Sequence, residues 1–520
     1  MTSSTVYIAS GAVTLVWLVY SVLEPLVLSP LAKIPGPKLF ALTRWRLAYE
    51  DWKGTRTQKI DDLHRQYGTA VRIGPNEVSF NSQSALRTIY GPGSRYGRTR
   101  FYRMFDVYGR QNLFTFHSSV EHGRRKKLLS FAYSKTNILN ETVAGMVEGK
   151  VDKFMKLIDT EPDHISDVFS TLHYYSLDNI TAFLYGKYGS TSAMEGTQAH
   201  RALIGDILDP ARRTLSWFAV HWPGLTRWLY TRTGLSERLV RPLLPMQKPA
   251  TYTGIRVFAL EAYNRFRQDM EDGKFDGNEG SILARLWKHS QEQNSDRLDD
   301  LDIASECADH FLAGIDTTSD TLMFLVWALS QPSSVGFQEK LRQEVLSIPD
   351  ESLTQTGTPR AAESDKCTYL HAVIKETLRL YAPLPSSEPR SLNVDSEIDG
   401  FLIPADTVVG MSPFSLHRNA EVFHHPLEFN PDRWLGPDAK ELNRWFWAFS
   451  SGGRMCIGMH LAMAEMTTLT AAIYRKYQTV VAPGFEDTTP GITARVEVFY
   501  DPRFPKMVEQ YCPIKFHELA

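Results

Sequence analysis

The stretch FSSGGRMCIG, residues 449–458, holds one cysteine and one arginine among three glycines. A thiol that binds a metal must be ionised, although a free cysteine has a pKa of roughly 8.5. Gly452 and Gly453 allow the backbone to curl, so that its N–H groups can face the sulfur of Cys456. A helix predicted to start after Cys456 would favour negative charge there. Arg454 offers a fixed cation for an anionic group of a cofactor, and Gly458 lets a flat ring lie close to the backbone. The alternative is a buried structural cysteine beside a glycine-rich turn.

The same stretch resembles the haem-binding loop of the cytochromes P450, whose pattern is F-x-x-G-x-R-x-C-x-G. Phe449, Gly452, Arg454, Cys456 and Gly458 match it. The resemblance implies that haem b is the cofactor and that the Cys456 thiolate is the proximal ligand of its iron, where it favours O–O cleavage. It also implies that Phe449 packs near the sulfur and that Arg454 pairs with a haem propionate.

A second motif, AGIDTT at residues 313–318, lies inside a predicted long helix. A glycine followed by an acid and two hydroxyls is poor helix material, so we expect a local opening of the helix. A capped break between two ordinary helices is the alternative. The run is similar to the oxygen-activation motif of the family, which implies that Asp316 and Thr317 are catalytic and deliver protons.

Glu376 and Arg379 lie three residues apart, on one face of an otherwise apolar helix. A surface ion pair is the usual meaning of such a spacing, but the apolar surroundings favour a buried network. The segment Pro431–Trp434 adds Arg433. This resembles the family's E-x-x-R motif and its second arginine, which implies a structural triad.

Three further residues are candidates for the cofactor carboxylates. Arg390 has an offset to Gly400 similar to that of the family's propionate-binding arginine. His122 and Lys126 stand where the family has W-x-x-x-R, so the chain departs from the pattern there. Surface cations are the alternative, and the neighbouring Arg124, Arg125 and Lys127 could face an acidic electron donor.

Composition limits the class of protein. The chain has 520 residues, a net charge of −2 and 43% hydrophobic residues, which suits a large core and gives no reason to expect nucleic acid as a partner. The spacing of Cys307, Cys367, Cys456 and Cys512 fits neither a disulfide framework nor a zinc pair.

The N-terminal segment predicts a single-pass membrane anchor. No charged residue occurs from Val6 to Tyr20, and Lys and Arg occur only after the segment. We therefore expect residues 1–30 to anchor the chain in the membrane of the endoplasmic reticulum, with the catalytic part in the cytosol. A cleaved signal peptide and a buried helix are the alternatives.

The remaining pattern predicts a mainly α fold with a small β part. We expect a proline-rich hinge at residues 31–40 and one catalytic domain at residues 41–520 with the cytochrome P450 fold. Hairpins are expected at Ala70–Phe80 and Asn393–Val409. The expected helices run from about Asp302 to Leu329, from Ser364-Asp365 to before Pro383, and onward from Cys456.

The resemblance implies a monooxygenase that inserts one oxygen atom from O₂ into a lipophilic small molecule. Electrons would come from an NADPH-cytochrome P450 reductase, with cytochrome b5 as a second candidate donor. The C-terminal run Val496–Tyr500 and the overall pattern look most like fungal enzymes of terpenoid, polyketide or alkaloid biosynthesis. A haem-thiolate isomerase or dehydratase that does not use O₂, and a non-catalytic haem-binding protein, are the alternatives.

The substrate pocket is expected in four places, each assigned by resemblance. These are the loop from Phe101 to Phe114, the long helix near Phe311 and Ala313, the turn Leu384–Ser387, and the segment Gly491–Thr493. Their composition indicates an apolar ligand without specifying which one.

Overall fold

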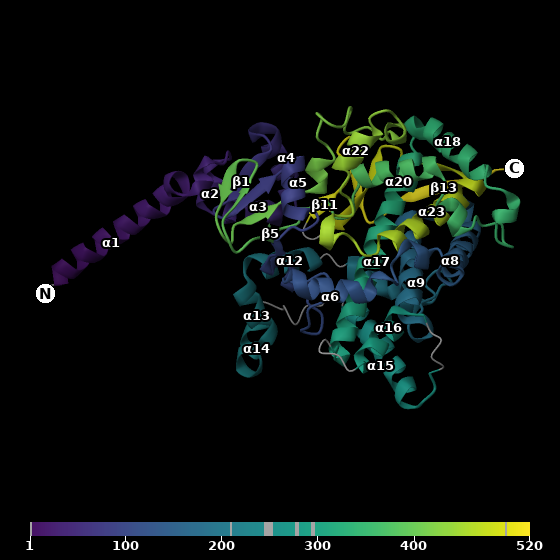
Figure 1. The fold of residues 1–520 in the computed structure, drawn as a ribbon, viewed down its shortest axis with the longest axis horizontal. Helices are drawn as coiled ribbons and strands as arrows, with labels where there is room; N and C mark the ends of the chain where they lie inside the picture. Colours follow the sequence, from purple (N-terminus) through teal and green to yellow (C-terminus); the bar gives the residue numbers. More distant parts are fainter. Residues whose placement is uncertain are drawn as a thin grey trace.

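Helices form most of the molecule, and short strands gather in the upper part of the body (Figure 1). The computed structural model describes residues 3–208, 211–243, 253–275, 280–292, 297–494 and 497–519. Helix α1 (Ser3–Leu23) extends away from a single body. The predicted class, mainly α with a small β part in one domain, is confirmed.

The helices before the centre of the fold are α2 (Lys38–Leu42), α3 (Trp45–Lys53), α4 (Arg56–Tyr67), α5 (Gln83–Tyr90), α6 (Ser119–Ser130), α7 (Lys135–Ile138), α8 (Glu141–Asp159), α9 (Val168–Tyr185), α10 (Gln198–Arg201), α11 (Gly205–Leu208), α12 (Ala211–His221), α13 (Pro223–Thr231), α14 (Gly234–Val240), α15 (Thr253–Glu271) and α16 (Ile282–Gln291). Those from the centre onward are α17 (Asp300–Leu329), α18 (Val335–Leu346), α19 (Ala361–Ser364), α20 (Thr368–Leu380), α21 (Pro413–Leu416), α22 (Ala439–Trp445) and α23 (Met459–Lys476).

The long helix α17 crosses the whole body (Figure 1). A capping box starts it, because Asp299 accepts the N–H of Asp302 over 2.8 Å and Asp302 accepts the N–H of Asp299 over 3.1 Å. The predicted opening near residues 313–318 is wrong, since α17 continues unbroken. Gly314 serves packing instead: a Cβ there would lie 2.4 Å from Cγ1 of Ile180 on α9.

Helix α20 starts later than predicted. Ser364-Asp365 ends the short helix α19, and α20 begins at Thr368 without a side-chain cap of its own. The carboxylate of Glu344 on α18 accepts the N–H groups of Tyr369 and Leu370, both over 2.8 Å. A distant residue therefore satisfies the helix start, which no local pattern reveals.

The largest sheet has the strand order β1 (Ala70–Gly74), β2 (Glu77–Phe80), β8 (Val408–Gly410), β5 (Arg390–Ser391) and β3 (Gly97–Arg98). The first predicted hairpin is confirmed, because Ala70 pairs with Phe80. The second is shorter than predicted: β6 (Ser396–Ile398) pairs with β7 (Phe401–Ile403) around Asp399-Gly400. Val408 and Val409 instead belong to β8, which runs parallel to β2.

Two smaller sheets complete the β part. Their strands are β4 (Ile165–Asp167), β13 (Pro513–Glu518) and β9 (Tyr477–Val481) in one, and β11 (Glu497–Phe499), β10 (Thr488–Ala494) and β12 (Lys506–Glu509) in the other. Val496, the first residue of the C-terminal run, lies outside the described residues.

The main core lies where α9, α17, α20 and α23 meet. Their apolar side chains form one buried cluster, to which α17 contributes the run from Leu322 to Leu329. Burial on several sides explains why this part of α17 is almost continuously apolar. The packing fixes α17 and the start of α23 relative to each other, and these two segments carry the two main predicted motifs.

The N-terminal segment forms a helix, but the structure does not confirm a membrane-spanning one. Among the residues described, none of the helices has the length and apolar character needed to cross a membrane. The side chains of residues 3–9, 11 and 18, and the whole of residues 1 and 2, lie outside the described part, and the predicted anchor depends on several of them. The anchor therefore stays a prediction.

The segment after α1 is packed on the body. Ile34 is buried, and the carbonyl of Pro35 accepts the N–H of Arg72 on β1 over 2.8 Å. Gly36 has a φ of +153°, and a Cβ there would lie 2.5 Å from the carbonyl oxygen of Arg72. Only glycine allows this close approach, which ties the predicted hinge to the first sheet.

Candidate functional site

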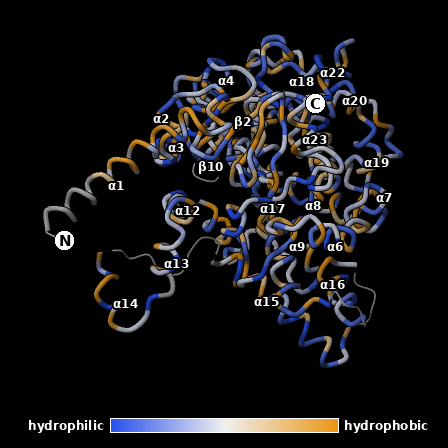
Figure 2. The backbone as a smooth tube through the Cα atoms, turned by 60° about the vertical axis from the view of Figure 1, so that its left-hand side comes forward, coloured by the Kyte–Doolittle hydropathy of each residue, from blue (hydrophilic) through white to orange (hydrophobic). Residues whose placement is uncertain are grey.

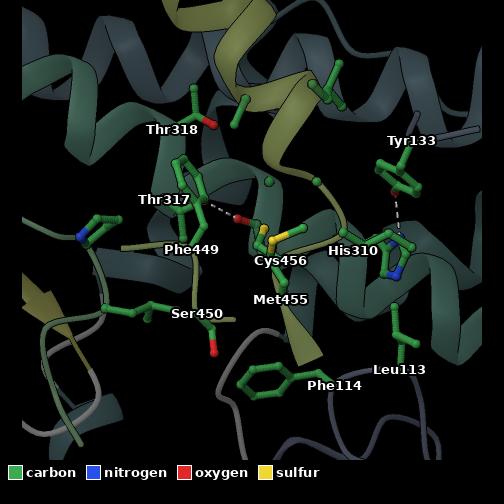
Figure 3. A pocket seen from close by; sticks show the side chains of 18 of the residues that line it. Leu113, Phe114, Tyr133, His310, Thr317, Thr318, Phe449, Ser450, Met455 and Cys456 are labelled. Atoms are coloured by element: carbon green, nitrogen blue, oxygen red, sulfur yellow. Dashed lines mark hydrogen bonds between the residues drawn. The ribbon is translucent and has the colours of Figure 1, made fainter. Parts of the chain in front are cut away.

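A cavity of about 260 Å³ lies between the middle of α17 and the segment that leads into α23. Side chains of β3 and of the loop before α6 close one side, and Pro383 and Leu384 close another. Figure 3 shows Thr317, Phe449 and Cys456 near one another in this cavity, with Leu113 and Phe114 opposite. The two strongest sequence motifs thus meet at one place.

The loop before α23 presents the sulfur of Cys456 to the cavity. The N–H of Cys456 donates to the carbonyl oxygen of Phe449 over 2.9 Å, which closes the loop, and both side chains line the cavity. Gly452 has a φ of +60°, and a Cβ there would lie 2.5 Å from the carbonyl oxygen of Tyr90. The loop therefore needs glycine at this position.

The groups around the thiol of Cys456 shift its pKa in opposite directions. Burial raises the pKa of Cys456 above its ordinary value, whereas the N–H groups of Gly458 and Met459 and the ammonium of Lys126 lower it. The expectation that the loop and the helix start alone would ionise the sulfur is therefore wrong, because burial outweighs these groups. A cation in direct contact with the sulfur would complete the ionisation. The described part of the chain contains no group of three or more His, Cys, Asp or Glu side chains placed to hold a metal ion.

A polar cluster lies beside the thiol, formed by the cations Arg98 and Arg454 and by the uncharged imidazole of His122. Burial, together with Arg98 and Arg390, lowers the pKa of Arg454 to about 9. Burial and then Arg454 lower the pKa of His122 to about 2. Within the described ranges, no carboxylate forms an ion pair with any of the three, and Nε of Arg98 has no hydrogen-bond partner. Such a cluster fits two carboxylates of a bound cofactor.

Arg98 is the member of this cluster that sequence reasoning missed. It lies on the two-residue strand β3, and the rings of Tyr102 and Phe114 lie 4.7 and 4.4 Å from its guanidinium carbon. Burial lowers its pKa to about 10. The only local signal is an arginine in the run Gly97–Arg100, which by itself resembles any surface turn.

Two residues predicted to contact the cofactor carboxylates lie elsewhere. Arg390 is fully buried behind the cavity wall, where it donates to Glu388 over 2.9 Å and to the hydroxyl of Tyr102 over 2.6 Å. Lys126 donates to the carbonyls of Gly453 and Met455, both over 2.9 Å. Neither is among the described residues that line the cavity. Arg390 supports the wall, and Lys126 holds the thiol loop.

Only some of the basic side chains of α6 are exposed to solvent. Arg124 and Lys127 are exposed, but Arg125 is buried and forms an ion pair with Glu306 on α17. Glu306 also accepts the N–H of Leu113 over 3.1 Å. Arg125 therefore fixes the loop above the cavity, and the expectation that it faces an electron donor is wrong.

Thr317 and Asp316 point to different places. The hydroxyl of Thr317 lines the cavity and donates to the carbonyl of Ala313 over 2.8 Å. Asp316 lies on the side of α17 that faces α9, where its charge raises the pKa of buried His173 against the larger lowering effect of burial. His173, which sequence reasoning missed, lies 3.9 Å from Asp320.

Glu376, Arg379 and Arg433 form a buried network. Arg379 donates to both oxygens of Glu376, over 2.8 and 2.9 Å, and Arg433 donates to the same carboxylate over 3.0 Å. The indole of Trp434 adds a bond of 3.0 Å. A fully buried carboxylate is tolerated only when it is paired in this way, so the geometry agrees with a structural role.

Two acids in the cavity wall, the half-buried Asp309 and the buried Glu465, were not predicted. Burial raises the pKa of Asp309 on α17 to about 7, and that of Glu465 on α23 to about 8.

The predicted pocket residues Phe114, Ala313 and Leu384 line the cavity. Phe311 instead packs in the core, with its ring 5.9 Å from that of Tyr185. The cavity lining does not include Gly491–Thr493.

The loop that leads into α23 presents one thiol, and arginine side chains without carboxylate partners lie next to it. These two features together define a haem-thiolate site. Comparison with known proteins agrees. Residues 35–493 match the family model described as cytochrome P450. The chain belongs to the cytochrome P450 family; haem is its cofactor, and it is an oxidoreductase.

Similar proteins come from filamentous fungi. The chain is 25% identical over 461 residues to the cytochrome P450 monooxygenase orf2 of Aspergillus niger, with 87% of each chain covered. It is 29% identical to tazI of Aspergillus terreus, covering 86% of this chain and 87% of the relative. It is 26% identical to aflV of Aspergillus parasiticus, covering 95% and 93%. Both relatives are also named cytochrome P450 monooxygenases.

Among solved structures, the crystal structure of the cytochrome P450DA heme domain is similar with a TM-score of 0.71 at 16% identity. The alignment covers 94% of this chain and 98% of that one. At this identity the likeness shows the fold alone.

Proposed function

We propose that this chain inserts one oxygen atom from O₂ into a lipophilic small molecule of fungal secondary metabolism, and that the other oxygen atom is reduced to water. The observation that carries this proposal is the meeting of Thr317 and Cys456 in one cavity, the hydroxyl on α17 and the thiol on the loop before α23. An enzyme that only rearranges its substrate has no need of a hydroxyl that delivers protons.

Each group of residues has a separate task. Haem supplies the oxidation chemistry when it is bound. Cys456 is its thiolate ligand, and Arg98, His122 and Arg454 hold its carboxylates. Phe449 limits access of water to the sulfur. Thr317 holds a proton at Oγ1 and passes it into the cavity, and Asp316 replaces that proton from the side of α9.

We further propose that electrons come from an NADPH-dependent cytochrome P450 reductase, with cytochrome b5 as a second donor. The surface around the thiol loop suits an acidic partner. Met455 is exposed there, Arg124 and Lys127 of α6 are exposed, and Lys126 binds the loop itself. Opposite charge would speed the encounter.

A membrane location is part of the same proposal, with the endoplasmic reticulum as the compartment and the catalytic domain in the cytosol. Exposed aromatic side chains gather where α3 meets the helices after residue 211, and the rings of Trp45 and Trp222 lie 5.2 Å apart. Apolar segments of α1, α2 and α14 lie on the same side of the body (Figure 2). Tryptophan and tyrosine favour membrane interfaces.

Two measurements test the proposal. The reduced protein with carbon monoxide should give a thiolate-type shift of the haem absorption band. Product should then form only with NADPH, reductase and O₂ together. A normal band with turnover that ignores O₂ would instead identify an isomerase or dehydratase. A normal band with no turnover of any lipophilic extract would favour a non-catalytic haem protein. Deletion of the gene followed by metabolite profiling addresses the terpenoid, polyketide and alkaloid classes.

A further inference from the structure

Asp309 is a carboxylate in the wall of the cavity that none of the roles above uses. It lies on α17, one helical turn before Ala313 and two turns before Thr317, and all three side chains line the cavity. With a rise of 1.5 Å per residue, Asp309 and Thr317 lie about 12 Å apart along the helix. An acid thus faces the cavity at a fixed distance from the hydroxyl where protons are delivered.

The groups around Asp309 are largely committed to other partners. Those that act on its charge are His310 and Glu306 of α17, Arg98 of β3 and the backbone N–H of Phe114. Nδ1 of His310 lies 2.6 Å from the hydroxyl of Tyr133, and its Nε2 lies 3.3 Å from Glu306, which also pairs with Arg125. Arg98 belongs to the cluster that holds the haem carboxylates. Within the described residues, no cation forms an ion pair with Asp309.

This environment disfavours the ionised form of the Asp309 carboxylate when no ligand is bound. Burial raises the pKa of Asp309 to about 7, and the N–H of Phe114 and the nearby cations offset burial only in part. A half-buried carboxylate without an ion-pair partner loses hydration that these groups replace only in part. A positive charge placed in the cavity would stabilise the ionised form. The other nearby walls, formed by Leu113, Phe114 and Leu384, suit an apolar body attached to that charge.

We propose that Asp309 binds the protonated nitrogen of a lipophilic amine substrate, and that this contact directs oxidation to a carbon on the order of 10 Å from the nitrogen. The inference rests on the proposed monooxygenase function. Among the expected product classes it selects the alkaloids and other basic metabolites.

The test compares two ligands of one shape. Octyltrimethylammonium carries a permanent positive charge and has no lone pair for iron. Its hydrocarbon analogue has a carbon atom in place of the nitrogen. Both are titrated into the haem-loaded protein, and binding is measured by the shift of the haem absorption band and by calorimetry. We expect the wild type to bind the cation at least about tenfold more tightly at pH 8, and Asp309→Asn to remove this preference.

The pH dependence follows from the acid itself, because the charge of the ligand does not change. Affinity for octyltrimethylammonium should fall from pH 8 to pH 6 as Asp309 becomes protonated, and the hydrocarbon should show no such change. Asp300→Asn, on the same helix but exposed, is the matched control and should behave as wild type. Oxidation of the bound cation should fall near the far end of its octyl chain.

The measurements distinguish failure of the amine-binding inference from failure of the proposed monooxygenase function. Equal losses of affinity for both ligands in Asp309→Asn would mean that Asp309 only supports the loop at Phe114, and would overturn the inference. The same holds if the wild type binds the two ligands equally. In either case, a normal carbon monoxide spectrum and reductase-dependent turnover would leave the proposed function standing.

Discussion

The N–H of Cys456 donates to the carbonyl oxygen of Phe449 over 2.9 Å, and this bond closes the loop that presents the thiol to the cavity. The loop between the two residues curls back on itself, so its shape depends on backbone conformation more than on side-chain packing. The left-handed Gly452 lies inside this turn.

Gly452→Ala should damage the loop. The new Cβ would lie 2.5 Å from the carbonyl oxygen of Tyr90 at a φ of +60°. Left-handed strain and overpacking together should cost about 2–4 kcal/mol. We expect a lower melting temperature and less haem per chain after purification. Gly453→Ala is the matched control, because its Cβ would meet nothing within 4 Å. Equal haem content in the two variants would contradict this account of the loop.

Arg98→Gln should weaken haem binding. Its guanidinium is buried without a carboxylate partner, so the haem carboxylate is expected to supply one. The loss of a charge-assisted hydrogen bond predicts haem release about tenfold or more faster, measured by transfer to an acceptor protein. Arg100→Gln, two residues away and exposed, should release haem at the wild-type rate. If both variants behave alike, Arg98 does not hold the cofactor.

Thr317→Ala should preserve the carbon monoxide spectrum but divert electrons from product. The variant lacks the hydroxyl that delivers protons into the cavity, so we expect several-fold more hydrogen peroxide per NADPH consumed. Ser319→Ala is the control. Its hydroxyl also bonds to a carbonyl of α17, at Ile315 over 2.8 Å, but it is fully buried outside the cavity lining. If Thr317→Ala forms as little hydrogen peroxide per NADPH as the wild type, Thr317 does not have the catalytic role proposed here.

Glu465→Gln should change how stability depends on pH. Burial raises the pKa of Glu465 to about 8, whereas an unfolded glutamate titrates near 4.3. Between these values the native protein keeps a proton that the unfolded chain has released. Native stability therefore falls as pH rises, by up to about 1.4 kcal/mol per pH unit.

The glutamine variant removes that contribution, so it should gain stability relative to wild type from about pH 5 to about pH 8. Urea unfolding of the haem-loaded protein, followed across this range, measures the difference. Glu397→Gln, on an exposed strand, should run parallel to wild type. A parallel profile for Glu465→Gln would mean that Glu465 is ionised in the native state.

The parts of the site that the sequence predicted are those whose residues lie close together in the chain. The loop from Phe449 to Gly458 and the pair Asp316–Thr317 are local patterns. The hairpin around Gly74 also follows from turn chemistry within a few residues. Glu376 and Arg379 are local as well, and the apolar positions around them indicated burial.

The residues that the sequence did not predict depend on distant partners. Arg98 belongs to the site because it packs on Phe114 and lies close to Arg454. Arg390 does not line the cavity, because it pairs with Glu388. The local sequence predicts a surface cation at Arg125, because its partner, Glu306, is 181 residues away. The start of α20 was misplaced for the same reason, since Glu344 caps it from another helix. Long-range pairing of charges leaves no local signal.

The most direct test of the central claim is the absorption spectrum of the purified, reduced protein with carbon monoxide, recorded for wild type and for Cys456→His. We predict a thiolate-type, red-shifted band in the wild type and its complete loss in the variant, with retained haem giving the spectrum of an imidazole ligand. A thiolate-type band that survives in Cys456→His, or a wild-type protein that binds haem without this band, would contradict the assignment of Cys456 as the iron ligand.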